Sequence, residues 1–293
     1  MSILHTLLAI LVALLWGFTF VAIKVGLGEF PPLLFAALRF VVVAFPAVFF
    51  VPRSGIAWRW IVAVGLAMGV FQFGLLYIGM AIGMPAGLSS LVVQSQALFT
   101  LVFSTWILHD VPRRQQWLGL GLAIAGMGAI ALSRSGHASI LGLLFVLGSA
   151  ASWAVGNICI KLAKVNNGFR LLVWMALVPP LPLLGLSAQF ESGQWAALRS
   201  LTFLGVGTIL YTGLISSLLC FGFWAYLVQH YSPNRVAPLS LLVTIFGMAF
   251  SVLLLGDHLS QWEIAGSMLV FVGLCCTLMT PTHASKIMDS APK

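Results

Sequence analysis

The sequence has very little charge, and least of all acidic charge. Its 293 residues include 14 Lys and Arg, 6 Asp and Glu, and 61% hydrophobic side chains, and its mean hydropathy is +1.09. A soluble domain of this length needs far more polar surface to cover its core. The composition therefore excludes the ordinary soluble classes and predicts a polytopic membrane protein.

No carboxylate falls in the middle of an apolar run. The acidic residues lie at the ends of these runs or between them: Glu29, Asp110, Glu191, Asp257, Glu263 and Asp289. The histidines are placed in the same way: His5, His109, His137, His230, His258 and His283. Many proton-coupled carriers use a carboxylate inside the membrane as a proton relay. We therefore expect downhill movement or exchange of a solute, without coupling through a buried titrating side chain.

Motifs for ATP binding, metal binding and catalysis are missing as well. There is no GxxxxGK[ST] loop to bind nucleotide phosphates and no HExxH segment to bind zinc. There is also no pair of carboxylates of the kind that hydrolyses glycosidic bonds. The cysteines form no CxxC pair and lie inside apolar runs, where they act as small hydrophobic side chains: Cys159, Cys220, Cys275 and Cys276. We expect no catalytic residue, no metal and no cofactor. An intramembrane enzyme or a scaffold is the alternative of another class.

What the sequence does contain is long apolar runs. A membrane-spanning helix needs about 20 mainly apolar residues, and these runs do not alternate between apolar and polar residues as β-barrel strands do. The first run follows MSILH, which lacks the basic start of a signal peptide, so we interpret it as a helix. We predict an all-α protein with ten transmembrane helices at 4–25, 31–51, 60–82, 86–108, 115–133, 139–161, 170–189, 201–228, 234–256 and 261–280.

Basic residues gather on one side of these predicted helices. With ten spans, one side holds Arg53, Arg59, Arg113, Arg114, Lys161, Lys164, Arg170, Arg235, Lys286 and Lys293. The other side holds only Lys24, Arg134 and Arg199. Because basic connectors stay in the cytoplasm during insertion, both termini are predicted to be cytoplasmic. The net charge of +8 is thus explained by membrane topology, and no nucleic-acid partner is expected.

The chain also contains an internal repeat. The stretch LLWGFTFVAIKV, from Leu14, resembles ASWAVGNICIKL, from Ala151, and LHDVPRRQQWLGLGLAIAGMG resembles LGDHLSQWEIAGSMLVFVGLC. The first pair of stretches matches at a spacing of 137 residues and the second at 147: Trp16 with Trp153, Lys24 with Lys161, Asp110 with Asp257, Gly119 with Gly266 and Gly126 with Gly273. A repeat of this length indicates duplication of a whole helical unit.

Each copy holds five predicted helices, and this odd number inverts the second copy in the membrane. The copies cover residues 1–136 and 137–283, followed by a cytoplasmic tail at 284–293. Two inverted five-helix repeats are a common transporter architecture, with the substrate between them near the middle of the membrane. A scaffold built by duplication is the simpler alternative, and we favour transport.

Two glutamines interrupt the apolar run 86–108. Gln94 and Gln96 lie about 200° apart around a continuous helix, so they cannot face the same space. We expect one to face a central cavity and the other to hydrogen-bond a neighbouring helix, because amides serve both purposes in membranes. The sequence does not decide which glutamine has which role.

Other polar and aromatic residues inside the runs complete the candidate substrate site. Trp153 and Asn157 lie four residues apart on one helix face, Trp16 occupies the matching place in the first copy, and Gln72 lies within the third run. Indole rings and amides suit a small polar molecule with an apolar part. For the two tryptophans, anchoring at the membrane interface is an equal alternative.

Arg39 is the only basic residue well inside a predicted span. An arginine in that position is a functional candidate, and it could bind a carboxylate. It lies only about 12 Å along the helix from Pro31, so bonding to helix-end carbonyls is the alternative. We slightly favour a structural role for Arg39.

Several stretches resemble a known transporter family. WGFTFVAIKVGL, PPLLFAALRFVVVAFPAVFF, GMPAGLSSLVVQSQALFT, SWAVGNICIK and VAPLSLLV are similar to the EamA family of the drug/metabolite transporter superfamily, and to its bacterial O-acetylserine/cysteine and aromatic amino acid exporters. The resemblance covers about residues 4–280. The chain lacks two features of relatives. Its ninth predicted helix reads LLVTIFGMAF, without the proline that some family members have there, and its first helix lacks the glutamate of the small multidrug carriers.

The resemblance implies an exporter in the bacterial inner membrane. Its substrates would be amino acids and related small metabolites, namely cysteine and O-acetylserine and also aromatic amino acids, moved by alternating access. The family plan implies a cavity lined by Gln72, Gln94 or Gln96, Trp153 and Asn157, with Trp16 nearby. A carrier of purines, sugars or small drugs is the alternative within the same class. The expected partners are the small-molecule substrate and the lipid bilayer, and the oligomeric state is not predicted.

Overall fold

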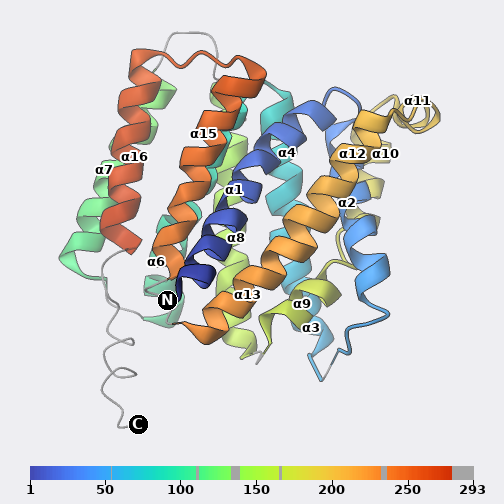
Figure 1. Cartoon of the computed structure of the whole chain (residues 1–293), viewed down its shortest axis with the longest axis horizontal. Coiled ribbons are helices and arrows are strands. Elements are labelled where there is room, and N and C mark those ends of the chain that lie inside the picture. Colours follow the sequence, from blue (N-terminus) through green and yellow to red (C-terminus); the bar gives the residue numbers. More distant parts are fainter. Residues whose placement is uncertain (54, 110–111, 133–138, 165–166, 232–235, 279–293) are drawn as a thin grey trace.

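The computed structural model describes residues 1–53, 55–109, 112–132, 139–164, 167–231 and 236–278, and every regular element in these ranges is helical (Figure 1). In Figure 1, α7 and α16 form an outer pair at the left edge, and α1 and α8 run through the middle. In chain order the elements are α1 (Ile3–Gly26), α2 (Pro32–Ala47), α3 (Trp58–Val64), η1 (Gly65–Phe71), α4 (Gln72–Ala81), α5 (Ala86–Val93), α6 (Gln96–Leu108), α7 (Arg114–Ala131), α8 (Ile140–Ala163), α9 (Gly168–Met175), α10 (Pro180–Phe190), α11 (Gln194–Arg199), α12 (Phe203–Leu210), η2 (Tyr211–Leu219), α13 (Cys220–His230), η3 (Ala237–Leu241), α15 (Leu242–Leu255) and α16 (Gln261–Leu278).

Many of these helices are long and apolar enough to cross a membrane. Six qualify by length and composition: Ile3–Gly26, Trp58–Ala81, Ala86–Ile107, Ile140–Ala163, Gly168–Phe190 and Phe203–Val228. Shorter apolar helices accompany them: Pro32–Ala47, Leu239–Leu255 and Gln261–Thr277. A chain with this many apolar helices is a multi-pass membrane protein, as the composition predicted. The boundary between residues 136 and 137, the tail 284–293 and Asp110 lie outside the described residues.

Five of the predicted runs contain a break or a segment that is not α-helical, and in the run 234–256 it is the 3₁₀ segment η3, which precedes α15. The run 60–82 contains the π-helical segment η1, and the run 201–228 contains the π-helical segment η2. The run 170–189 divides into α9 and α10 at Pro179 and Pro180, because proline donates no backbone hydrogen bond and disfavours a helical residue before it.

The run 86–108 divides into α5 and α6 at Gln94 and Ser95. The carbonyl of Val92 accepts from the backbone N–H of Ser95 at 3.0 Å and from its hydroxyl at 2.6 Å, so the backbone tightens into a 3₁₀-type turn that the side chain supports. The angle of about 200° expected between Gln94 and Gln96 assumed an unbroken helix. The break therefore removes the basis of that estimate.

The outer pair α7 and α16 is joined by direct backbone contact. A Cβ atom added at Gly126 would lie 2.5 Å from the carbonyl oxygen of Gly266, and one added at Gly119 would lie 2.5 Å from that of Gly273. Small residues let membrane helices approach this closely. The glycine-rich stretches of the two sequence copies thus pack on each other within one chain, and we call this contact the glycine seam.

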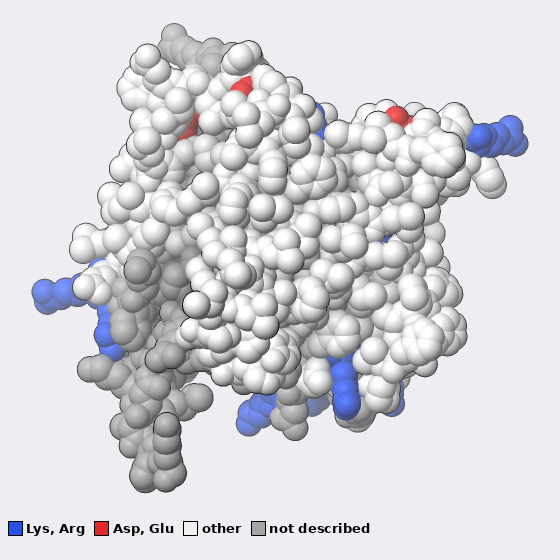
Figure 2. Space-filling model, in the orientation of Figure 1, with Lys and Arg blue, Asp and Glu red and all other residues white. Residues whose placement is uncertain are grey.

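Charged side chains are distributed unequally over the surface. Figure 2 shows Lys and Arg gathered mainly along the lower and left edges, with a further group at the upper right, whereas the visible Asp and Glu atoms lie along the upper edge. The N-terminus lies at the lower side of the same view (Figure 1). The broad middle of this face carries uncharged residues, as expected for a surface in contact with lipid.

Candidate functional site

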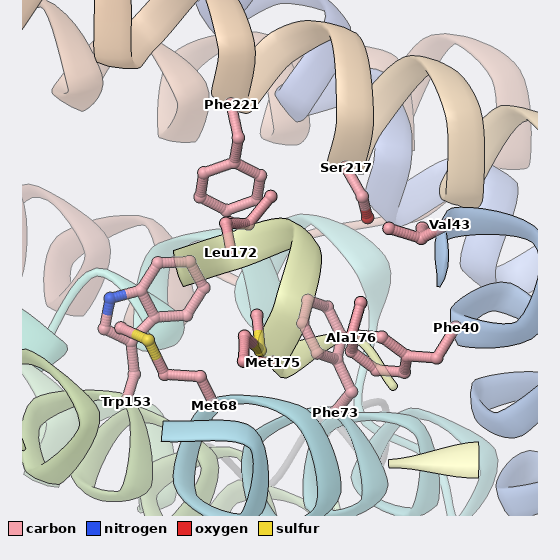
Figure 3. A pocket seen from close by; sticks show the side chains of 10 residues that line it. All are labelled: Phe40, Val43, Met68, Phe73, Trp153, Leu172, Met175, Ala176, Ser217 and Phe221. Carbon is pink, nitrogen blue, oxygen red and sulfur yellow. The ribbon is translucent and has the colours of Figure 1, made fainter. Parts of the chain in front are cut away.

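A small cavity lies where helices of the first half of the chain meet helices of the second half. Its volume is about 30 Å³. Figure 3 shows the lining side chains, which are Phe40, Val43, Met68, Phe73, Trp153, Leu172, Met175, Ala176, Ser217 and Phe221. A cavity of this size has room for water, whereas sites for organic ligands measure about 300–1,000 Å³. The cavity as it stands is therefore too small for an organic solute, which could bind there only if the cavity widened.

Two tryptophans at matching places in the sequence copies flank one phenylalanine of this cavity. Trp153, on α8, stacks on Phe221 with ring centroids 5.9 Å apart, and Trp16, on α1, meets the same ring edge-on at 5.1 Å. The indole nitrogen of Trp16 donates to the carbonyl of Ser216 at 2.9 Å, and its ring also lies 5.2 Å from that of Trp224. Both tryptophans lie within the bundle, and only Trp153 lines the cavity itself.

Gln72 is buried at the first position of α4, with 1% of its surface exposed. Its carbonyl oxygen Oε1 has no hydrogen-bond partner among the residues that the structure describes. Its chain neighbour Phe73 lines the cavity. A buried amide oxygen without a partner costs about 1–3 kcal/mol, so this group is a candidate acceptor for a donor that enters with a substrate.

The other amides make contacts outside the cavity lining. The side-chain nitrogen of Gln94 donates to the carbonyl of Ser240 at 3.0 Å, and that of Asn157 donates to the hydroxyl of Thr100 at 3.1 Å. Gln96 is partly exposed, and its side chain makes no hydrogen bond to another of the described residues. Gln94 thus bonds a neighbouring helical segment, and Gln96 keeps its donors and acceptor available.

Arg39 is fully enclosed next to the cavity. It has 1% of its surface exposed. Its Nε and Nη2 atoms donate to the hydroxyl of Ser217 at 3.1 and 2.7 Å, and Nη1 donates to the hydroxyl of Tyr77 at 3.2 Å. The guanidinium carbon lies 3.8 Å from the centre of the Phe73 ring. None of these partners comes from the helix-end carbonyls that the sequence suggested as an alternative.

Several lining residues were not predicted from the sequence. Ser217 follows Ser216 inside the eighth run, and this pair of hydroxyls was not singled out; Phe221 is one of 21 phenylalanines. A second signal was their position in the half of the eighth run that corresponds to Phe73 and its neighbours in the third. Among the described residues, no group of three His, Cys, Asp or Glu could hold a metal ion.

Comparison with known proteins places the chain in a family. The sequence pattern of the EamA-like transporter family matches residues 4–132 and again residues 140–279. A probable amino-acid metabolite efflux pump of Salmonella typhimurium is 41% identical over 276 residues, covering 91% of this chain and 92% of the relative. A protein of Escherichia coli with the same description is 38% identical over 276 residues, again covering 91% of this chain and 92% of the relative.

A solved structure described only as a crystal structure of a protein also matches. Its TM-score is 0.53 at 18% sequence identity, covering 99% of this chain and 100% of the other, so it supports the fold alone. The family pattern covers nearly the whole chain in two consecutive copies. The chain therefore belongs to the EamA-like transporter family, and it is a transporter rather than an enzyme.

Proposed function

We propose that the protein exports amino acids and related small metabolites, such as cysteine, O-acetylserine and aromatic amino acids, across the inner membrane of a bacterium. The observation that carries the proposal is the similarity, at 41% and 38% identity over nearly the full length, to two probable amino-acid metabolite efflux pumps. The cavity between the two halves of the chain also supports a transport function, because transporters built from repeats bind substrate at the repeat interface.

We further propose that the chain forms ten spans in two inverted repeats, at residues 1–136 and 137–283. A twofold axis in the membrane plane would place Gly119 on Gly266 and Gly126 on Gly273. A contact of Gly119 with Gly273 then requires the equivalent contact of Gly126 with Gly266. Both contacts occur in the glycine seam, and this reciprocity supports the inverted arrangement.

The interruptions of the helices support the same arrangement. The π-helical segments η1 and η2 fall about one repeat spacing apart, at Gly65–Phe71 and Tyr211–Leu219. Gln94, at the break between α5 and α6, corresponds at the 147-residue spacing to Leu241, where η3 gives way to α15. Interrupted helices at equivalent places in both copies are typical of transporters whose halves exchange roles during the cycle.

The proposed orientation places both termini, including the tail 284–293, in the cytoplasm. The excess of Lys and Arg at the edge of Figure 2 that also holds the N-terminus supports this placement, because basic connectors are retained on the cytoplasmic side.

In this proposal the cavity opens to each side of the membrane in turn. Trp153 and Trp16 position the apolar part of the solute on the two sides of Phe221. Gln72, Gln96 and Asn157 offer hydrogen bonds to its polar groups, and Gln94 joins the two halves through Ser240. The helix breaks let parts of each span move while the glycine seam stays fixed.

Uptake by liposomes that contain the purified protein tests this function. We expect labelled cysteine or phenylalanine to enter down its gradient, with competition by other amino acids and little by purines, sugars or cationic drugs. Uptake should be the same with and without a pH gradient, because no carboxylate lies in the middle of a span. Failure of every amino acid to enter, in vesicles whose protein is folded, would refute the proposal.

A further inference from the structure

We propose that Arg39 binds the carboxylate of the transported solute at one end of the cavity. This inference rests on the proposed function and adds to it the residue that recognises the acid group. It replaces the slightly favoured structural role that the sequence alone suggested for Arg39.

The first argument is the charge of Arg39. The side chain is 1% exposed, and an arginine stays charged in proteins. Its partners are two neutral hydroxyls and two aromatic rings, and no carboxylate of the described residues lies within ion-pairing distance. An enclosed charge without a counter-ion is strongly unfavourable. The site therefore favours an anion that arrives from outside the chain.

The second argument is the position of Arg39 relative to the cavity. Phe40, Phe73 and Ser217 all contact or neighbour its guanidinium group, and all three line the cavity. One layer of side chains thus separates the charge from the space where the solute would bind. In Figure 3 Phe40, Val43 and Ser217 lie at one end of this space, and Trp153 lies at the other.

The third argument is the geometry of the contact with Ser217. Its single hydroxyl oxygen accepts from both Nε and Nη2, at 3.1 and 2.7 Å. Those two parallel N–H groups form the edge of the guanidinium that binds the two oxygens of a carboxylate. Ser217 therefore occupies, from the cavity side, the place that a bidentate carboxylate would take.

The fourth argument is that Ser217 lies on a segment able to change. Its hydroxyl donates to the carbonyl of Thr212, five residues earlier, within the π-helical segment η2. π-Helical turns are rare, and they occur frequently at functional sites. A return of η2 to α-helical pairing would shift Ser217 away from Arg39 and expose the bidentate edge to the cavity.

The resulting site has two different ends. The carboxylate would bind Arg39, and the remainder of the solute would lie against Trp153 and Phe221, whose rings stack on each other. Aromatic faces accept both apolar groups and an ammonium group. The chemical class recognised at this site is therefore a small carboxylic acid, and an amino acid with a free carboxylate fits it.

The test compares acids with their primary amides in liposomes that hold the full-length protein. Unlabelled L-cysteine, L-cysteinamide, L-phenylalanine and L-phenylalaninamide compete with uptake of the labelled acids, and binding is also followed by thermal unfolding. We expect each acid to compete about 10- to 100-fold more strongly than its amide, which is the range for hydrogen bonds to a charged group. Equal competition by acid and amide overturns the inference while the proposed export function stands.

Two variants of Arg39 and a matched control complete the test. Arg39→Gln should bring acid and amide within about threefold of each other, and Arg39→Lys should keep part of the preference because it keeps the charge. The control Arg59→Gln removes the same charge from an exposed site and should leave the preference unchanged. A preference that survives in folded Arg39→Gln overturns the inference. If that variant does not fold, the acid and amide comparison in the wild-type protein decides.

The outcomes separate the two proposals. Failure of every amino acid to enter vesicles that hold folded wild-type protein removes the proposed function and this inference together. Uptake of an acid without discrimination against its amide removes only the role of Arg39.

Discussion

The glycine seam and the cavity are built in opposite ways. In the seam, α7 and α16 touch through backbone atoms at Gly126 and Gly266, and both helices are continuous. Around the cavity, long side chains from several helices meet and two segments are π-helical. Among the described residues, Arg39 has hydroxyl partners but no counter-ion, and the Oε1 atom of Gln72 has no hydrogen-bond partner. The comparison indicates that stability is concentrated at the edge of the bundle and adaptability at its centre.

The largest effect is expected from overfilling the seam. Gly126→Leu would place its Cβ atom 2.5 Å from the carbonyl oxygen of Gly266, and backbone cannot yield as a flexible side chain does. We expect a loss of about 3 kcal/mol of stability, the upper end of the usual cost of overpacking, seen as a lower folded yield in detergent and a lower unfolding temperature. The matched control is Gly121→Leu on the same helix, where no atom lies within 4 Å of the new Cβ. Equal stability of the two variants would refute the seam.

The next effect concerns the aromatic end of the cavity. Trp153→Ala removes the ring that stacks on Phe221, and we expect the KM for amino-acid uptake to rise about tenfold because large aromatic contacts are lost. Trp117→Ala, on the exposed side of α7, should change KM by less than about twofold. If both tryptophans matter equally, their role is anchoring at the membrane interface rather than contact with the solute.

A smaller effect is expected from Gln72. Because its Oε1 atom has no partner among the described residues, Gln72→Leu should not lower the unfolding temperature and could raise it. The KM should nevertheless rise about three- to tenfold, since the solute loses one hydrogen bond. Measurement of both quantities on one preparation checks this divergence. A fall in stability with unchanged KM would assign Gln72 to helix packing.

The smallest effect is expected from Gln94. Gln94→Leu removes the bond to the carbonyl of Ser240, and interhelical bonds of this kind contribute about 0.6 kcal/mol on average. We expect a change of about threefold in the maximal rate, since the bond joins two segments that move, with little change in KM. Gln96→Leu, in contrast, should alter KM. The reverse result would exchange the roles assigned to the two glutamines.

Much of the fold followed from the apolar pattern. The run 139–161 predicted a helix that the structure gives as Ile140–Ala163. The breaks in the helices were harder to predict from the sequence, because the division at Gln94 and Ser95 depends on local hydrogen bonds that the apolar pattern does not show. Proline at positions 179 and 180 disfavours a continuous helix, and α9 and α10 are separate there.

The site was harder to predict than the fold. Of the aromatic residues, Trp153 stood out through the repeat, whereas Phe221 resembled the many other phenylalanines. The partner of Arg39, Ser217, lies 178 residues further along the chain. Nothing in the sequence near Arg39 indicates such a contact, because tertiary packing alone brings the two together. The residues of the candidate site therefore remain predictions until transport is measured.

The central claim is that one cavity between the two halves of the chain opens to each side of the membrane in turn. Cysteine labelling tests it most directly, in a chain whose native Cys159, Cys220, Cys275 and Cys276 are replaced by Ser and whose cavity residue Val43 is replaced by Cys. We expect a membrane-impermeant maleimide to label that thiol from the cytoplasmic side and from the opposite side, and a transported amino acid to slow both reactions. Labelling from only one side, or from neither side in folded protein, would contradict the account.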